Sequence, residues 1–550
     1  MSTPPMHVSP LSRSPKRRSS LTAALISLAC TVFSVSSQAR DADATLGFGG
    51  PGAGAGALTG QARINVDLAG SNRYDSAVSV IPIYTPTVNF GESALVGYWV
   101  VGQACRASPS PNCPLVEIVI SKLTANGKPD VSFGSGGTVL IDQPGWSAVK
   151  VATTGYSTNT LSHLYIGGTK RLSATDQDFA IIEVDNAGAV VPSFGFGGER
   201  TVAFDLGGGN NDDQLSSLIL AAAPTVSGSY AVLYAVGSVQ RSNPADYDFA
   251  IARINLNSSG AQLDTTFNGT GKMVIPFDLI GGGRDTASDV VMFNDLSILV
   301  AGTVQRSATS TNAAVAVVLP NGVLDSAFCS DAAICSDQGV LGVPAGKRIL
   351  PLDANNPTGT NTSANAVALT EVVGSDIWVG GGAGVGLALF QFGRGSTGAG
   401  HFASPIATNA TAMDLIYKKP FLYAAGFAQQ GGQDVGVVAR YDLRKVDFRD
   451  FSFGTDAGQP SFYSINSLNG SSGFAAATAW RSLALAPTLI NLFNAPTNTP
   501  ITPIVCVGRA RWATDPAGNP PIDDTDLALM SFGASDTIFR DSLETQFDLN

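Results

Sequence analysis

Pro129-Asp-Val-Ser-Phe-Gly-Ser-Gly-Gly137 is a short glycine-rich stretch that recurs along the chain. Asp264-Thr-Thr-Phe-Asn-Gly-Thr-Gly271 repeats it almost position for position. Looser copies are Pro192-Ser-Phe-Gly-Phe-Gly-Gly198, Asp325-Ser-Ala-Phe328 and Arg449-Asp-Phe-Ser-Phe-Gly454. A motif that returns this often indicates stacked structural repeats rather than unrelated domains.

The aromatic residue of this stretch sets the period of the repeat. The intervals from one Phe to the next are 85, 61, 73, 61, 64, 61 and 79 residues, so four of the seven lie between 61 and 64. An interval of about this length holds one supersecondary unit. The positions used are Phe48, Phe133, Phe194, Phe267, Phe328, Phe392, Phe453 and Phe532.

Each interval contains short apolar runs in the same order. The second interval has them at 138–142, 148–152, 164–168 and 178–185. Runs of this length that are rich in Val and Ile and bounded by Gly, Asn and Asp predict strands, and none is long enough for a helix. The third run of each unit ends in glycine, at Gly102, Gly168, Gly237, Gly302, Gly381, Gly426 and Gly508. Asn126-Gly127 and Asn321-Gly322 follow fourth runs, where they predict tight hairpin turns.

Four strands in each of seven units predict an all-β, single-domain fold, a seven-bladed β-propeller of four-stranded antiparallel blades. A blade buries its faces only against its neighbours, so the ring must close, and closure also protects the sheet edges. We expect the recurring turn to carry the chain from one blade to the next. The expected boundaries are 1–39 for a signal peptide, 40–533 for the propeller and 534–550 for a tail.

The repeat resembles the bacterial delta-60 repeat family. The resemblance rests on the turn Asp264 to Gly271, on Gly207-Gly-Gly-Asn-Asn-Asp-Asp213, on Leu233 to Gly237 and on Asp248 to Arg253. It covers roughly residues 40–533 and is strongest from 130 to 330. Membership implies an exported, propeller-like repeat protein, and it brings no common activity and no catalytic residues to carry over.

The N-terminus has the three parts of an export signal. Arg13, Lys16, Arg17 and Arg18 precede an apolar run from Leu21 to Val35, and Ser37-Gln38-Ala39 offers small residues for cleavage. The Arg pair also allows a twin-arginine signal, and Cys30 allows a lipoprotein. We expect cleavage after Ala39 and no transmembrane segment, with an extracellular or cell-envelope location.

Charge and cysteine content fit this location. Without residues 1–39 the chain keeps 28 basic and 43 acidic residues, a formal charge of −15, which disfavours nucleic-acid binding. In an oxidising compartment the spacing predicts two local disulfides, Cys105–Cys113 and Cys329–Cys335. Cys506 lies in an apolar run and is expected to be a buried free thiol.

The C-terminal tail resembles a motif of exported proteins. Residues Ser535 to Glu544 resemble a short terminal motif, Ile-Phe-x-Asp-Gly-Phe-Glu, found on exported bacterial proteins. Ser542 and Leu543 replace its Gly and Phe. Either a sorting motif or a frayed end accounts for this segment.

Polar residues recur a few positions after the third-run glycine. The candidates are Arg106, Arg171, Gln240, Arg241, Gln305 and Arg306. Equivalent positions in successive blades share one rim, so these side chains could bind a carboxylate or a sugar, since Arg offers two parallel donors. The alternative is structural, a blade-to-blade pairing of each Arg with the Asp before the next strand, such as Asp178 or Asp248.

Catalytic chemistry has little support in the residues. Only His163 and His401 remain after processing, and there is no Gly-x-Ser-x-Gly turn for a nucleophile. No acidic cluster has the Asp-x-Asp-x-Asp-Gly spacing of a calcium loop, so no metal, cofactor or catalytic residue is predicted.

The sequence therefore predicts a monomeric, exported, non-enzymatic binding or scaffold module with an unknown protein or carbohydrate partner. Two alternatives stay open. One is a carbohydrate-active hydrolase or lyase with acidic loop residues in the propeller funnel. The other is a surface adhesin, which would present an exposed aromatic patch.

Overall fold

The structure is a computed structural model of the 550-residue chain. It describes residues 61–64, 66, 75–85, 92–106, 113–154, 163–206, 211–329, 345–351, 361–370, 376–384, 386–394, 400–404, 410–430, 433–445, 448, 462–464, 479–485, 489–491, 501–510 and 526–535. All of them belong to one compact unit, Gln38–Asn550. The regular elements among them are strands, and none of these residues forms a helix long and apolar enough to cross a membrane. The predicted signal peptide and residues 536–550 of the predicted tail lie outside the described residues.

Five separate sheets each supply a four-stranded antiparallel blade. The first has β2 (Ser76–Tyr84), β3 (Glu92–Cys105), β4 (Val116–Thr124) and β5 (Thr138–Ile141), with β28 (Leu489–Asn491) beside β3. The second has β6 (Trp146–Thr154), β7 (Leu164–Arg171), β8 (Gln177–Val184) and β9 (Glu199–Val202). The third has β10 (Asp213–Thr225), β11 (Gly228–Gln240) and β12 (Tyr247–Asn255), which pairs with both β13 (Gln262–Leu263) and β14 (Lys272–Ile275). The fourth has β15 (Thr286–Met292), β16 (Ile298–Gln305), β17 (Thr311–Val318) and β18 (Lys347–Leu350). The fifth has β27 (Ala479–Leu485), β29 (Ile501–Ala510), β30 (Asp526–Ser535) and β1 (Gln61–Ile64).

The remaining sheet is a continuous one of eight strands. It contains β19 (Ala366–Leu369), β20 (Asp376–Ala383), β21 (Gly386–Gly393), β22 (Gly400–Ser404), β23 (Thr411–Lys418), β24 (Phe421–Gln430), β25 (Gln433–Asp442) and β26 (Phe462–Ser464). The all-β propeller is thus confirmed. Five blades are separate sheets instead of the seven predicted, because the strands between 366 and 464 hydrogen-bond into one sheet.

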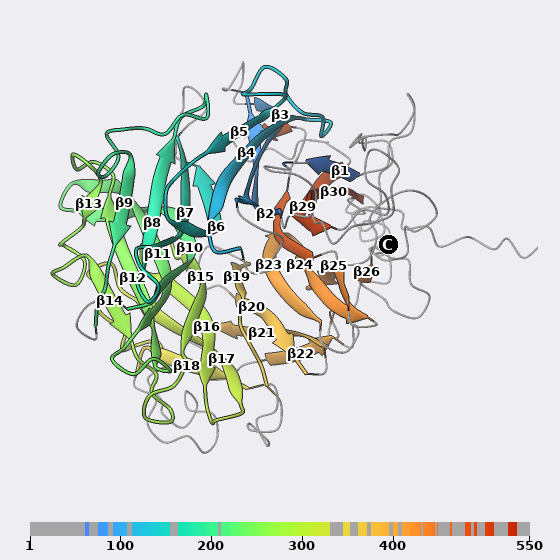
Figure 1. Ribbon diagram of the computed structural model, residues 1–550. Helices are drawn as coiled ribbons and strands as arrows, with labels where there is room; N and C mark the ends of the chain where they lie inside the picture. The colour runs from blue at the N-terminus through green and yellow to red at the C-terminus, as the bar shows by residue number, and fades with distance from the viewer. Residues whose placement is uncertain are drawn as a thin grey trace, which may run out of the picture. The chain divides into compact units, whose positions relative to one another are not determined.

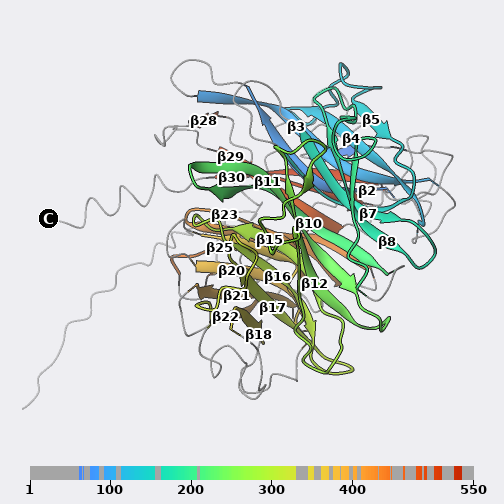
Figure 2. The ribbon, with the colours of Figure 1, turned by 90° about the vertical axis from the view of Figure 1, so that its left-hand side faces the viewer.

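The first strands of the successive units follow one another around a centre. β2 contacts β6, β6 contacts β10, β10 contacts β15 and β15 contacts β19. The contacts continue from β19 to β23 and from β23 to β27, and β27 contacts β2. Figure 1 shows these strands around the middle of the ribbon, and Figures 1 and 2 agree that β3–β5 and β16–β18 lie on opposite sides.

The hydrophobic cores lie between neighbouring sheets. Trp99 and Ile118 of the first sheet pack in one cluster with Trp146 and Ile182 of the second. Similar clusters join the second sheet to the third and the third to the fourth. Since each sheet is covered on both faces by its neighbours, burial of its apolar residues requires the whole arrangement.

The recurring turn has a different place from the one predicted. It connects the third strand of a blade to the outer strand of the same blade, as between β4 and β5. Within it, the amide of Phe133 donates to Asp130 O at 2.9 Å, and the amide of Gly137 donates to Phe133 O at 3.0 Å. The ring of Phe133 is buried against Trp99, with centroids 5.0 Å apart.

Not every predicted copy is such a turn. Phe194, Phe267 and Phe328 are buried like Phe133, and each precedes an outer strand. Phe392 instead lies inside β21 and Phe532 inside β30. Phe48 and Phe453 fall outside the described residues.

The sequence repeat is therefore offset from the blade by one strand. Each repeat first completes the preceding blade and then supplies three strands of the next. The first repeat has no preceding blade, so its strand β1 pairs with β30, from Gln61↔Met530 to Ile64↔Leu527. The two ends of the chain thus share one sheet.

Candidate functional site

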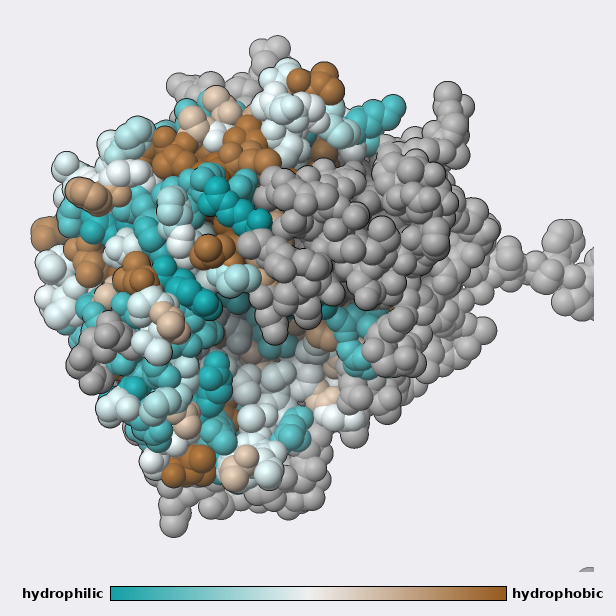
Figure 3. Space-filling view, viewed as in Figure 1, coloured by the Kyte–Doolittle hydropathy of each residue, from teal (hydrophilic) through white to brown (hydrophobic). Residues whose placement is uncertain are grey.

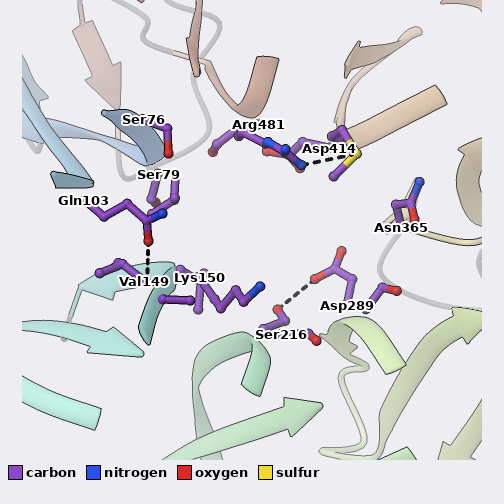
Figure 4. Close-up of a pocket in the computed structure, with 17 residues that line it drawn as sticks. Ser76, Ser79, Gln103, Val149, Lys150, Ser216, Asp289, Asn365, Asp414 and Arg481 are labelled. Atoms are coloured by element: carbon purple, nitrogen blue, oxygen red, sulfur yellow. Dashed lines mark hydrogen bonds between the residues drawn. The ribbon is translucent and has the colours of Figure 1, made fainter. Parts of the chain in front are cut away.

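A cavity of about 390 Å³ lies where the inner strands meet. Residues of β2, β6, β10, β15, β23 and β27 line it, together with Gln103 of β3 and Asn365 just before β19. Figure 4 shows polar side chains pointing into this space from separate strands. On the face seen in Figure 3, hydrophilic residues lie beside a hollow between the sheets. The charged lining residues are Lys150, Asp289, Asp414 and Arg481.

Irregular strand pairing directs one residue of each of six inner strands into the cavity. The register of β10 against β11 skips Ser216, and that of β15 against β16 skips Ser288. An extra residue of this kind is a β-bulge, which bends the strand and turns its own side chain. The same skip occurs at Val78 on β2, Lys150 on β6, Met413 on β23 and Arg481 on β27.

The bulges explain the glycines of the repeat. A Cβ on Gly237 would lie 2.0 Å from the carbonyl oxygen of Gln214, because the bulged strand presses that carbonyl against β11. The distances are 2.2 Å at Gly302 and 1.9 Å at Gly426, each to a carbonyl oxygen of the paired inner strand. Only glycine leaves room for this approach. Each of these glycines therefore lies opposite a bulge whose side chain lines the cavity.

Two cations face the cavity. Lys150 is exposed to the cavity, and the inner strands around it displace bulk water, which lowers the pKa of its ammonium. The charge of Arg481 lowers that pKa further. Burial also lowers the pKa of the Arg481 guanidinium. Within the part of the chain that the structure describes, no ion pair joins either side chain to a carboxylate.

Arg481 is held by weak contacts rather than by a counter-ion. Its Nη1 lies 4.0 Å from Met413 Sδ, and its guanidinium lies 6.0 Å from the centre of the Phe427 ring. Asp434 raises its pKa, but Arg509 lowers it and already holds Asp434 in a 2.9 Å ion pair. Within the described residues, Arg481 therefore has no ion pair of its own.

Asp289, unlike Arg481, has partners for its charge, because hydrogen-bond donors from three strands surround it. Ser217 Oγ donates to its Oδ1 at 2.9 Å, the amide of Val290 donates to the same atom at 2.8 Å, and the amide of Val367 donates to Oδ2 at 2.9 Å. Burial raises its pKa to about 6, and these donors oppose the rise. Asp289 thus ties β10 and β19 to β15.

Three of the four predicted rim arginines contact polar groups of their own blade. Arg106 donates to Asp142 and lies 3.1 Å from Glu117 in an ion pair. Arg241 forms an ion pair with the fully buried Asp248. Arg306 donates from Nη1 to Asn312 Oδ1 at 3.4 Å. Asp248 is the aspartate that the structural alternative named for Arg241, but the pair lies within one blade and does not join neighbouring blades.

The other rim candidates also lie at loop ends. Gln240 donates to Pro244 O at 2.9 Å, and Gln305 accepts from the amide of Arg284 at 2.8 Å. Arg171 is exposed at the end of β7. None of the six predicted residues lines the cavity, and their role in ligand binding stays a prediction. Sequence reasoning missed the cavity residues because their types vary, although the glycines opposite them were visible.

The cysteines follow the predicted pattern where they are described. Cys105 and Cys113 form a disulfide with Cα atoms 5.7 Å apart, which confirms that pair. Cys329 is also disulfide-bonded, and Cys335 lies outside the described residues. Cys506 is buried in β29 without a disulfide.

Three aspartates come together in the third blade, and of these the sequence singled out only Asp248. Oxygen atoms of Asp246, Asp248 and Asp278 lie within 4.8 Å of one another. Arg241 already donates to Asp248. The guanidinium of Arg241 thus supplies a positive charge to these three carboxylates.

Comparisons with known proteins show likeness in structure only. No protein-family model matches the chain, and no curated protein matches it. The polysaccharide lyase Uly1 is 10% identical over 91% of this chain and 98% of its own, with a TM-score of 0.41. Sqt1 of Chaetomium thermophilum, bound to the N-terminus of ribosomal protein L10, is 11% identical over 84% and 99%, with a TM-score of 0.39. The GH93 α-L-arabinofuranosidase of Fusarium graminearum is 12% identical over 67% and 93%, with a TM-score of 0.35. No functional conclusion follows at these values.

Proposed function

We propose that this chain is an exported, non-enzymatic β-propeller that binds a small polar molecule in the cavity between its inner strands. The observation that carries the proposal is the series of bulges, each of which turns one side chain into the same space. Bulges of this kind are frequent next to functional sites. The cavity, at about 390 Å³, lies within the size range of small-molecule sites, roughly 300–1,000 Å³.

A hydrolase is the second candidate, and Asp289 is the reason to consider it. Its pKa of about 6 is suitable for a general acid. However, its two oxygens already accept three hydrogen bonds. A general acid must reach a substrate oxygen, and these donors hold the carboxyl group between strands instead. Binding is therefore the better supported function.

Blocking the cavity tests this proposal. A panel of mono- and disaccharides and small organic acids is screened by ligand-observed NMR against the secreted protein. Ser216→Trp fills the cavity and should abolish each specific signal, whereas Ser259→Trp, on an exposed turn, should not. Signals that survive Ser216→Trp place binding elsewhere. Release of new reducing ends from a bound sugar identifies a hydrolase.

We also propose that the eight-stranded sheet consists of two blades, which makes seven. The single pair Gly382↔Thr411 joins its halves. One core cluster contains Trp378 and Leu389 of one half with Leu422 and Val437 of the other. Face-to-face packing of this kind is what neighbouring blades do. A crystal structure in which the two halves form one open sheet, without this core, contradicts the proposal.

The delta-60 resemblance and export belong to the same proposal. The Cys105–Cys113 disulfide supports an oxidising compartment. Mass spectrometry of the protein from culture medium and from the periplasm should find an N-terminus at Arg40. An uncleaved chain in the cytoplasm would contradict export.

A further inference from the structure

We infer that the cavity is an anion site, in which Lys150 and Arg481 bind a carboxylate or similar oxyanion of a small hydroxyl-rich ligand, with an acidic sugar as the fitting class. The inference rests on the proposed function and names the ligand chemistry of that site. It concerns the centre of the propeller, not the rim arginines.

The charges that line the cavity are unequally engaged. Asp289 accepts three hydrogen bonds from neighbouring strands. Asp414 takes part in interactions of its own. Lys150 has no hydrogen bond or ion pair within the described residues, and Arg481 has only the sulfur contact with Met413. The charged groups that can still bind a ligand are therefore the two cations, Lys150 and Arg481.

The position of these cations makes an anion favourable. Lys150 is exposed to the cavity and Arg481 is half-buried, and charges surrounded by protein lose part of their hydration. Lys150 and Arg481 also repel each other. An oxyanion bound by both groups would remove the repulsion and supply charge-assisted hydrogen bonds, which are among the strongest that proteins form. Figure 4 shows Lys150 extending into the cavity and Arg481 facing it from β27.

Neutral groups around the cations suit hydroxyl groups. Ser216 and Ser288 line the cavity and make no side-chain hydrogen bond within the described residues. The Oε1 of Gln103 accepts a hydrogen bond from the amide of Val149 at 2.8 Å, and its NH₂ group remains as a donor. Such groups can donate to and accept from sugar hydroxyls. In an acidic sugar, the carboxylate would bind the two cations and the ring hydroxyls would bind these neutral groups.

The test compares two probes that differ in one group, D-glucuronate and D-glucose. Calorimetry with the secreted protein should show at least tenfold tighter binding of glucuronate. Lys150→Met and Arg481→Met should each remove most of that preference, which is measured as the ratio of the glucuronate and glucose affinities of the same variant. Lys150→Arg keeps the charge and should keep the preference. Lys128→Met removes the same charge from an exposed turn and should change nothing.

A second readout does not depend on the variants. Binding of glucuronate should raise the pKa of Lys150, followed through its side-chain nitrogen by NMR. Equal affinity for the two probes overturns the anion inference, and so does unchanged glucuronate binding in both Met variants. If a neutral sugar binds in a manner sensitive to Ser216→Trp, the proposed function stands while this inference fails. If nothing in the panel binds, both fail.

Discussion

Gly237 does not line the cavity, but its identity is explained by the bulge that does. Its own position has no room for a side chain, since a Cβ would meet Gln214 O at 2.0 Å and the Phe179 ring at 2.8 Å. The neighbouring strand makes this contact because it bulges at Ser216. A conformational preference of glycine alone would not explain the position, because no positive φ occurs there.

Gly237→Ala should therefore destabilise the protein by about 1–3 kcal/mol or more, the usual cost of overpacking. The measurement is the midpoint of urea unfolding. Gly384→Ala is the matched control, since a Cβ there has no heavy atom within 4 Å. If the two variants unfold at the same denaturant concentration, the close approach at the bulge does not exist.

Asp213 gives the stability of the protein a dependence on pH. Burial raises the pKa of this carboxyl to about 7, helped by the charges of Asp178 and Asp205. Its Oδ2 accepts the amide of Phe204 at 2.7 Å, but its buried Oδ1 has no partner. An unfolded Asp has a pKa near 3.9. The folded state thus holds the extra proton between about pH 4 and 7, and the stability it contributes is lost as pH rises through 7.

Asp213→Asn should weaken this dependence, because a neutral amide has no proton to lose. We expect the variant to be more stable than the parent at pH 8, by an amount on the order of 1–3 kcal/mol, and nearly equal at pH 5. Urea unfolding at both pH values measures the difference. A parent protein that gains stability from pH 5 to pH 8 relative to the variant would show that the carboxylate is stabilised when charged.

At the level of elements, the sequence predicted strands better than their grouping. Apolar runs and turns such as Asn126-Gly127 correspond to observed strands and hairpins, because period and turn chemistry are local. The offset between repeat and blade was not predictable. The turn at Phe133 lies between two strands in the sequence, and the sequence does not say whether the strand after it belongs to the same blade or to the next one. The cavity residues were missed because a bulge depends on backbone pairing, and its side chain can be Ser, Lys or Arg.

A disulfide between Cys105 and Cys113 closes the connection between β3 and β4. Cys105 is buried at the end of β3, whereas Cys113 is bonded eight residues later. Replacing both by Ser should cost about 2–3 kcal/mol by the loop-closure model. Guanidinium unfolding of the double variant is compared with the parent in oxidising and reducing buffer. The two proteins should differ only in oxidising buffer, and equal midpoints there would show that the bridge adds no stability.

At the level of the whole molecule, the offset repeat also explains how the ring closes. The outer strand of the last sheet must come from the start of the chain, and β1 fills that place beside β30. Ile64 and Val66 are buried in one cluster with Tyr98 of the first sheet and Leu529 of the last. Without β1 this sheet would lose its fourth strand, and β30 would be left as an open edge.

A chain that begins at residue 67 should therefore be less stable than one that begins at residue 58, which keeps β1. Burial of two apolar side chains sets the expected loss at about 3–6 kcal/mol, and the open edge should cause self-association. Urea unfolding and light scattering measure the two effects. Because β1 runs antiparallel to β30, residues 58–66 fused after Ser535 through a short Gly/Ser linker should restore both properties. The same segment in scrambled order is the control. Full stability of the shorter chain, or equal rescue by the scrambled segment, would show that the two ends do not close the ring.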